Sequence, residues 1–232
     1  MTGGKPKTGR WPSRWTERAG EWLSDEALSG LLLFLGIDLF VLPVVGPSLG
    51  DAVANAVFTV LLLSGLATVA HRAAVVASIG ALVAAALVLR WTASVSDLPV
   101  VPVVSVGAAI VVFALFTLLV LLRTLSPGPI NRHRIEGAIA TYLLIGITFA
   151  LAFELVERVQ PGSLQIGEGA PETLRDAVGY FSLVTITTVG YGDVTPVTPL
   201  ARRLAALEGL IGQLYPAIII GWMVGSMRRR GD

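Results

Sequence analysis

Apolar stretches separated by short polar segments dominate the pattern along the chain. There are six of them, at residues 27–45, 52–70, 73–94, 99–122, 136–156 and 203–226. A helix needs about 20 apolar residues to cross a hydrocarbon core about 30 Å thick, and all six stretches come close to that length. The pattern therefore predicts an all-α membrane protein with six transmembrane helices in each subunit.

The composition supports this class and excludes several others. Only 14% of the residues are charged, whereas a soluble domain carries about 25%, and the charges cluster at the ends of the apolar stretches. The net charge of +1 gives no indication of nucleic-acid binding. The chain has no cysteine, which excludes disulfides and thiol catalysis, and it shows no phosphate-binding loop. The sequence therefore predicts that the protein is not an enzyme.

The positions of lysine and arginine predict the orientation in the membrane. Basic residues lie before the first apolar stretch, after the second, between the fourth and fifth, and after the last, whereas the loops at 46–51 and 95–98 carry none. Basic residues accumulate on the cytoplasmic side of a membrane. We therefore expect a multi-pass protein of the plasma membrane with both termini in the cytoplasm.

The segment before the first apolar stretch is expected to lie on the membrane surface. Residues Arg10 to Leu23 place three tryptophans on one side of a helix: Trp11, Trp15 and Trp22. Tryptophan prefers the headgroup region, and an amphipathic helix of this kind lies in the interface. A disordered tail with incidental aromatic residues is the alternative.

A shorter helix is predicted between the fifth and sixth apolar stretches, from Pro171 to Thr187. Proline suits the first turn of a helix, and Glu172 favours its positive end. Apolar residues follow at helical spacing.

The residues that follow this helix, Thr188-Val189-Gly190-Tyr191-Gly192-Asp193, resemble the selectivity filter of prokaryotic potassium channels. The resemblance implies that the backbone carbonyls of Thr188, Val189, Gly190 and Tyr191 line a path for K⁺, with Gly192 and Asp193 supporting them. Stacked carbonyl rings replace the water shell of the ion, and a backbone that turns successive carbonyls inward needs residues that tolerate positive φ, such as glycine. In isolation, Gly192-Asp193 would also suit a polar turn.

The resemblance also implies an assembly and a division of the chain. One loop supplies a quarter of each oxygen ring, so a homotetramer in the lipid bilayer is expected, with K⁺ as the transported ion. The predicted parts are an N-terminal cytoplasmic segment, a four-helix transmembrane domain, a cytoplasmic linker and a pore domain, at residues 1–26, 27–123, 124–135 and 136–232. The pore domain would hold a re-entrant pore helix and filter loop between its two transmembrane helices.

The first four apolar stretches lack the basic residues of a voltage sensor. The fourth carries no lysine or arginine before Arg123, and steep gating needs several charges that each gain about 2.3 kcal/mol per 100 mV. We therefore expect passive K⁺ conduction without steep voltage gating. A weakly selective cation channel and a non-conducting accessory subunit are the alternatives, against which Tyr191 and the intact motif argue.

Two further features of the apolar stretches carry predictions. Asp38 and Arg90 are expected to form an ion pair near Asn55, because charges within a membrane usually pair. Gly212 and Pro216 in the last stretch are candidates for a gating hinge, since proline bends a helix; close helix packing at the glycines is the alternative. Val184 stands where some relatives have a buried glutamate, so no carboxyl is expected behind the filter.

Overall fold

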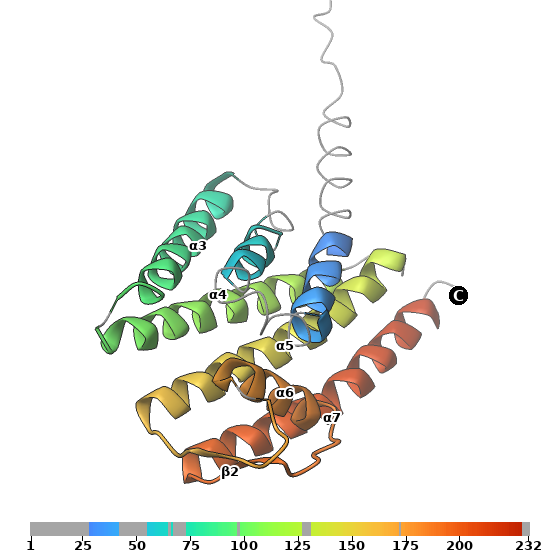
Figure 1. Cartoon of the computed structure of the whole chain (residues 1–232). Helices are drawn as coiled ribbons and strands as arrows, with labels where there is room; N and C mark the ends of the chain where they lie inside the picture. Colours follow the sequence, from blue (N-terminus) through green and yellow to red (C-terminus); the bar gives the residue numbers. More distant parts are fainter. Residues whose placement is uncertain are drawn as a thin grey trace, which may run out of the picture.

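The computed structural model describes residues 28–41, 55–64, 66, 73–96, 98–126, 131–171 and 173–228. Its described part is almost entirely helical (Figure 1). In chain order the elements are the helix Leu28–Val41, whose last turn is the π-helix η1 (Ile37–Val41), the helix Asn55–Ser64, α3 (Ala73–Ala93), α4 (Val100–Thr124), α5 (Arg132–Val159), β1 (Leu164–Ile166), α6 (Leu174–Ile186), β2 (Val194–Pro196) and α7 (Pro199–Arg228). The surface helix predicted at Arg10 to Leu23 lies outside the described residues.

Among the described residues, three helices are long and apolar enough to cross a membrane: α4, α5 and α7. The other apolar helices in the described part are shorter, and they coincide with the first three predicted stretches: Leu28–Val41, Asn55–Ser64 and Ala77–Ala93. The prediction of a mostly helical membrane protein is therefore confirmed, while the count of six spans stays a prediction.

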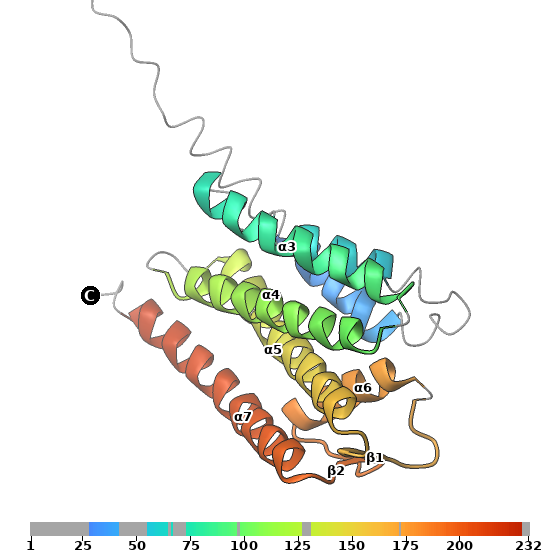
Figure 2. The same ribbon diagram turned by 90° about the vertical axis from the view of Figure 1, so that its left-hand side faces the viewer.

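The helices pack around two apolar clusters. The larger cluster joins the N-terminal helices to α4 and α5, and the rings of Phe58 and Phe113 meet in it with centroids 5.6 Å apart. The smaller cluster surrounds α6 and includes Phe153, Phe181 and Val194. α5 belongs to both clusters, and α7 runs antiparallel beside it (Figure 2). α5 therefore connects the N-terminal helices to the unit formed by α6 and α7.

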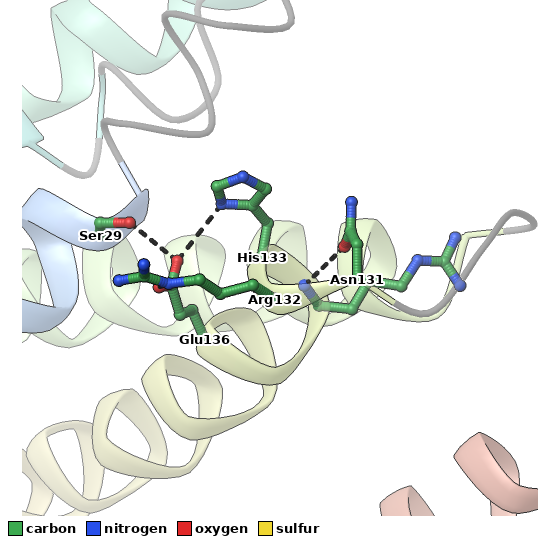
Figure 3. Close-up of polar contacts among 6 residues, drawn as sticks. Ser29, Asn131, Arg132, His133 and Glu136 are labelled. Carbon is green, nitrogen blue, oxygen red and sulfur yellow. Dashed lines mark hydrogen bonds and ion pairs between the residues drawn. The ribbon is translucent and has the colours of Figure 1, made fainter.

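A polar contact also ties the first helix to the beginning of α5. The carboxylate of Glu136 accepts hydrogen bonds from the Ser29 hydroxyl at 2.8 Å and from Arg132 Nε at 2.6 Å, and it lies 3.3 Å from His133 Nδ1 (Figure 3). The Asn131 side chain caps the same helix end by accepting from the backbone of residue 134. These contacts fix where α5 begins relative to the N-terminal helix.

The predicted ion pair between Asp38 and Arg90 is wrong in its partner. Asp38 Oδ1 accepts from Arg175 Nη2 at 3.2 Å, which links η1 to the first turn of α6. Arg90 Nε instead donates to Asn55 Oδ1 at 2.8 Å, and its guanidinium group lies 5.1 Å from the ring centre of Phe58. Asn55 and Phe58 lie one helical turn apart and together hold Arg90. Asp38 therefore pairs with Arg175 of α6.

Candidate functional site

The short helix α6 starts three residues later than the sequence predicts and ends within one residue of the prediction. Thr173 is its N-cap, because its hydroxyl oxygen accepts from Asp176 N at 3.1 Å. The same hydroxyl group donates to Asp176 Oδ2 at 2.6 Å. A threonine followed three residues later by an acidic residue is a stronger start signal than a proline. Pro171 therefore lies ahead of the helix.

The buried side of α6 is fastened to α5 and α7. The Ser182 hydroxyl donates to the Gly146 carbonyl of α5 at 2.6 Å. On the same side, the rings of Phe153 and Phe181 meet edge to face, with centroids 4.8 Å apart. Ser182 also contacts Oε1 of Glu208, which comes from α7. α6 is thus held between α5, which precedes it, and α7, which follows it.

Glu208 is a residue of this site that the sequence analysis missed. Its side chain is fully buried, at 0% exposure, and its Oε2 atom has no hydrogen-bond partner among the described residues. A carboxyl group therefore does lie behind α6, although it comes from α7 and not from the position of Val184. The signal was present in the sequence, since Glu208 is the only acidic residue in the stretch 203–226.

The C-terminal end of α6 meets two long helices at one carbonyl group. The Tyr142 hydroxyl of α5 donates to the Ile186 carbonyl oxygen at 2.9 Å. A Cβ atom on Gly212 of α7 would overlap this same oxygen. The last carbonyls of a helix have no partner within the helix, so Tyr142 satisfies one of them. Glycine at 212 lets α7 approach it.

The two long helices also contact each other near this carbonyl. The rings of Tyr142 and Tyr215 stack with centroids 5.8 Å apart and planes 30° apart. The Tyr215 hydroxyl donates to the Ala138 carbonyl of α5 at 2.9 Å. Pro216 follows directly, inside α7, which continues to Arg228. α5 and α7 are therefore joined by side chains immediately before the proline.

The loop Thr188–Asp193 leaves the end of α6 with an alternating backbone. The φ angles of Thr188, Gly190 and Gly192 are positive, at 61°, 54° and 85°, whereas Val189 and Tyr191 between them are not in this region. Positive φ is rare for a residue with a β-branched side chain. The amides of Val189 and Gly190 donate back to the carbonyl oxygen of Val184 in α6. In the single chain the loop is exposed from Thr188 to Gly192.

Asp193 fastens the far end of this loop through three contacts. Its Oδ2 accepts from the Tyr180 hydroxyl at 2.7 Å and its Oδ1 from the Val194 amide at 3.1 Å. Its backbone carbonyl accepts from the Gly167 amide at 2.7 Å. The hydrogen bond to the Asp193 carboxylate raises the pKa of the Tyr180 hydroxyl to about 12, so this hydroxyl remains a donor at neutral pH. The Tyr180 ring stacks on Tyr191, with planes 5° apart.

A two-stranded sheet supports the chain after Asp193. β2 pairs antiparallel with β1, so that Leu164 lies opposite Pro196 and Ile166 opposite Val194. Glu157 at the end of α5 accepts from the amides of residues 162 and 164. This contact orders the turn that leads into β1. The sheet lies at the end of the α5–α6–α7 unit where α7 begins (Figure 2).

A comparison with protein families finds a match to most of this unit. Residues 138–229 match the family described as "Ion channel". The matched region begins in α5 and includes α6, the loop Thr188–Asp193 and α7. No solved structure matches the chain significantly.

Several curated proteins are similar to part of the chain. The two pore potassium channel c of Oryza sativa subsp. japonica is 37% identical over 83 residues, which are 36% of this chain and 16% of that protein. The inward rectifier potassium channel Kirbac3.1 of Paramagnetospirillum magnetotacticum is 37% identical over 81 residues, 33% of this chain and 24% of that protein. The voltage-gated potassium channel of Aeropyrum pernix is 30% identical over 104 residues, 40% of this chain and 32% of that protein.

Each match covers about a third or less of the length of these relatives. All three are named as potassium channels, although their names give three different kinds of gating or architecture. Residues 138–229 therefore resemble an ion-channel domain, and the chain is similar over part of its length to proteins that are named as potassium channels.

Proposed function

We propose that the protein is a K⁺-selective channel that conducts passively, with the carbonyl oxygens of Thr188, Val189, Gly190 and Tyr191 as ligands of the ion. The observation that carries this proposal is the alternation of φ along the loop, with positive values at every second residue from 188 to 192. Such a backbone turns successive carbonyls toward one side. Rings of carbonyl oxygens are the ligands that replace the water shell of K⁺.

The electrostatics of the surrounding elements favour a cation at this loop. The loop follows the C-terminal end of α6, which carries the partial negative charge of the helix dipole. The Thr188 hydroxyl would add a further oxygen at the inner end. Asp193, held in place by Tyr180, would add negative charge at the outer end.

We further propose that four copies of the chain surround one pore. A single loop cannot surround an ion, and four identical loops would supply complete rings. Val189 and Tyr191 are 52% and 73% exposed in the single chain, although both side chains are large and much of their surface is apolar. Several large side chains of α7 are exposed as well, among them Leu207, Leu210, Leu214 and Ile218. Neighbouring subunits would cover such surfaces.

The proposed protein spans the plasma membrane six times, with both termini in the cytoplasm. The basic residues of the sequence support this orientation. In this proposal the chain has four parts: the segment 1–26, the four-helix domain 27–123, the linker 124–135 and the pore domain 136–232. Opening would occur by bending of α7 near Gly212 and Pro216, and the proline inside the helix supports this position.

Flux through purified protein in liposomes tests the proposal. We expect efflux of K⁺ and little efflux of Na⁺ from liposomes that hold the wild-type chain. The Gly190→Ala variant should lose this efflux, because alanine at a φ of 54° is strained and the strain recurs in each subunit. The matched control is Gly225→Ala in α7, where an added Cβ meets open space.

Three outcomes would contradict parts of the proposal. Equal efflux of Na⁺ and K⁺ would show a weakly selective cation channel. Absence of any efflux, with chemical crosslinking that shows no tetramer, would favour an accessory subunit. Efflux that Gly190→Ala leaves unchanged would show that the ions pass elsewhere.

A further inference from the structure

A cavity of about 430 Å³ lies between the N-terminal helices and α6. Its lining comes from η1, the helix Asn55–Ser64, α3, α4, α5 and α6, and it is mostly apolar, including Leu39, Phe113 and Leu151. The loop Thr188–Asp193 is not part of this lining. Pockets that bind small molecules have volumes of about 300–1,000 Å³, apolar walls and a few placed polar groups. The cavity therefore has the size and character of a small-molecule site.

The carboxylates of the lining have partners inside the chain. Asp38 Oδ1 lies 3.2 Å from Arg175 Nη2, and Glu154 Oε1 lies 2.7 Å from Arg158 Nη2. The third carboxylate, that of Asp176, accepts a hydrogen bond from the N-cap residue of α6 in an exposed contact. A carboxylate that is paired or in contact with water does not need a cation from an occupant.

The second arginine of the lining, Arg90, is stabilised within the chain as well. Its Nε donates to Asn55 Oδ1 at 2.8 Å, and its charge interacts with those of Asp38 and Glu154. With Arg158 included, three guanidinium groups accompany three carboxylates at this cavity. Because neither sign of charge is in excess, a charged occupant would be buried without a counter-ion, which is costly. The lining therefore favours a neutral occupant.

One donor at the wall of the cavity has no partner among the described residues. Arg175 uses Nη2 to bind Asp38, while its Nη1 atom is buried and makes no hydrogen bond there. Only one other buried side-chain nitrogen or oxygen in the described part of the chain is left in this way, Glu208 Oε2. A buried donor without a partner is costly. An acceptor oxygen on a neutral occupant would satisfy Nη1 without adding a charge.

We propose that this cavity binds a neutral, mainly apolar molecule with a carbonyl oxygen, such as a ketone or an ester, and that this oxygen accepts from Arg175 Nη1. The apolar part of the molecule packs along the lining, against Leu151 and Val184. The carbonyl oxygen of Val184 also accepts from the amides of Val189 and Gly190. The occupant therefore contacts the turn of α6 that holds the start of the loop that follows.

Binding to the purified full-length chain in a neutral detergent tests this proposal. The probe is benzophenone, which is neutral and apolar, carries one carbonyl oxygen, and on illumination inserts into nearby C–H bonds. Mass spectrometry of the labelled peptides locates the site, and competition against labelling measures the affinity of other compounds. Diphenylmethane has the same two rings without the oxygen, while 4-benzoylbenzoate and 4-(aminomethyl)benzophenone add a negative and a positive charge. None of these readouts needs ion conduction, so the outcome is independent of the proposed channel function.

We expect saturable labelling of peptides from the helices that line the cavity. Benzophenone should bind at least about tenfold more tightly than diphenylmethane, as one hydrogen bond to a charged donor implies. Both charged relatives should bind more weakly than benzophenone. Equal affinities of benzophenone and diphenylmethane, tighter binding of either charged relative, or labelling confined to peptides outside the lining would each overturn the proposal.

A neutral lipid and a compact free molecule are the two sources of such an occupant. Monoolein distinguishes them, because it carries an ester carbonyl on a single long chain and no charge. Displacement of benzophenone by monoolein would support a membrane lipid as the source. Saturable benzophenone binding that monoolein does not displace would support a compact molecule.

Two variants each remove one feature of the cavity. Arg175→Lys keeps a positive charge beside Asp38 but lacks the second guanidinium nitrogen, so benzophenone should bind no more tightly than diphenylmethane. Gly179 lines the cavity and an added Cβ meets nothing within 4 Å, so Gly179→Leu should fill the space, favour the helix and abolish labelling. Arg203→Lys and Gly107→Leu, both outside the lining, are the matched controls and should bind as the wild type does.

Thermal unfolding establishes that each variant is folded before its binding is compared. A folded Arg175→Lys variant that still prefers benzophenone over diphenylmethane tenfold would overturn the proposed hydrogen bond. A folded Gly179→Leu variant that is labelled as strongly as the wild type would overturn the proposed site.

Discussion

Glu208 shows how one buried side chain can determine the position of α6. The carboxyl group lies between α6 and α7 and reaches Ser182, while its second oxygen has no described partner. Burial of a charged group without full pairing is costly, whereas an uncharged group of the same shape keeps the contact. We therefore expect this site to require a side chain with the shape of Glu208 and its hydrogen bond with Ser182.

Substitutions at Glu208 separate charge from shape. Glu208→Gln offers an oxygen to Ser182 and should change the free energy of unfolding by less than about 1 kcal/mol. Glu208→Ala leaves a void between α6 and α7 and removes the contact with Ser182, and it should cost about 2–4 kcal/mol. Thermal or denaturant unfolding in micelles measures both. If Glu208→Gln lowers the free energy of unfolding as much as Glu208→Ala does, the charge of the carboxylate itself is needed.

Tyr180 links the outer end of the loop to α6 through Asp193. Because the pKa of its hydroxyl is raised to about 12 from about 10 in an unfolded chain, the hydrogen bond stabilises the fold fully below pH 10. This stabilisation is lost as the pH rises from 10 through 12. The Tyr180→Phe variant lacks the bond at every pH.

The difference in melting temperature between wild type and Tyr180→Phe should therefore be constant up to pH 10 and shrink above it. The other tyrosines titrate in both proteins and cancel in the difference. A difference that does not change between pH 9 and pH 12 would show that Tyr180 does not hold Asp193 through its hydroxyl.

Gly212 is required by packing, whatever its part in gating. A Cβ atom there would overlap the Ile186 carbonyl, so Gly212→Ala must push α7 away from the end of α6. Overpacking of this kind costs about 1–3 kcal/mol. The control is Gly221→Ala in the same helix, where the added Cβ meets open space and alanine favours the helix by about 1 kcal/mol. Equal unfolding temperatures of the two variants would contradict the close contact at Gly212.

Between elements, the ion pair of Asp38 with Arg175 connects the N-terminal helix to α6. The two residues lie 137 positions apart, and this contact joins the N-terminal part of the chain to the family-matched unit. A double-mutant cycle with Asp38→Asn and Arg175→Gln should give a coupling energy of about 0.5–3 kcal/mol in unfolding. The cycle of Asp38→Asn with Arg90→Gln is the control and should couple less. A larger coupling energy for Asp38 with Arg90 than for Asp38 with Arg175 would support the ion pair that the sequence predicts.

The elements themselves were largely predictable from local patterns. The apolar stretches located all the long helices, and the end of α6 follows from the threonines before the loop. The prediction places the start of α6 three residues too early, because Pro171 suits a first helical turn, whereas Thr173 forms the N-cap in the structure. Periodicity reports which residues avoid water, so it defines a helix face well and a helix end less well.

Contacts between distant elements were not predictable in the same way. The sequence predicts an ion pair of Asp38 with Arg90 because both charges lie in apolar stretches. The pattern does not show that α6 places Arg175 beside Asp38. The sequence predicts no carboxyl behind the filter because Val184 stands at that position, and it does not show that Glu208 of α7 packs there. Both outcomes depend on the packing of helices against each other, which a single sequence does not encode locally.

For the whole molecule, the composition of α4 predicts the response to voltage. Its one basic residue is Arg123, in the last turn, so few charges are available to move in the field. Steep gating needs several charges per subunit, each worth about 2.3 kcal/mol per 100 mV. We expect the open probability to change little between −100 and +100 mV. A sigmoidal activation curve with several gating charges would contradict this.

Selectivity for K⁺ is the central property of the proposed assembly. The most direct measurement is the reversal potential of the purified protein in planar bilayers, with K⁺ on one side and Na⁺ on the other. We predict a reversal potential close to the K⁺ equilibrium potential, as expected if four loops with the alternating backbone of residues 188–192 form the path. A reversal potential near zero would show that these carbonyls do not select K⁺ and would contradict the account.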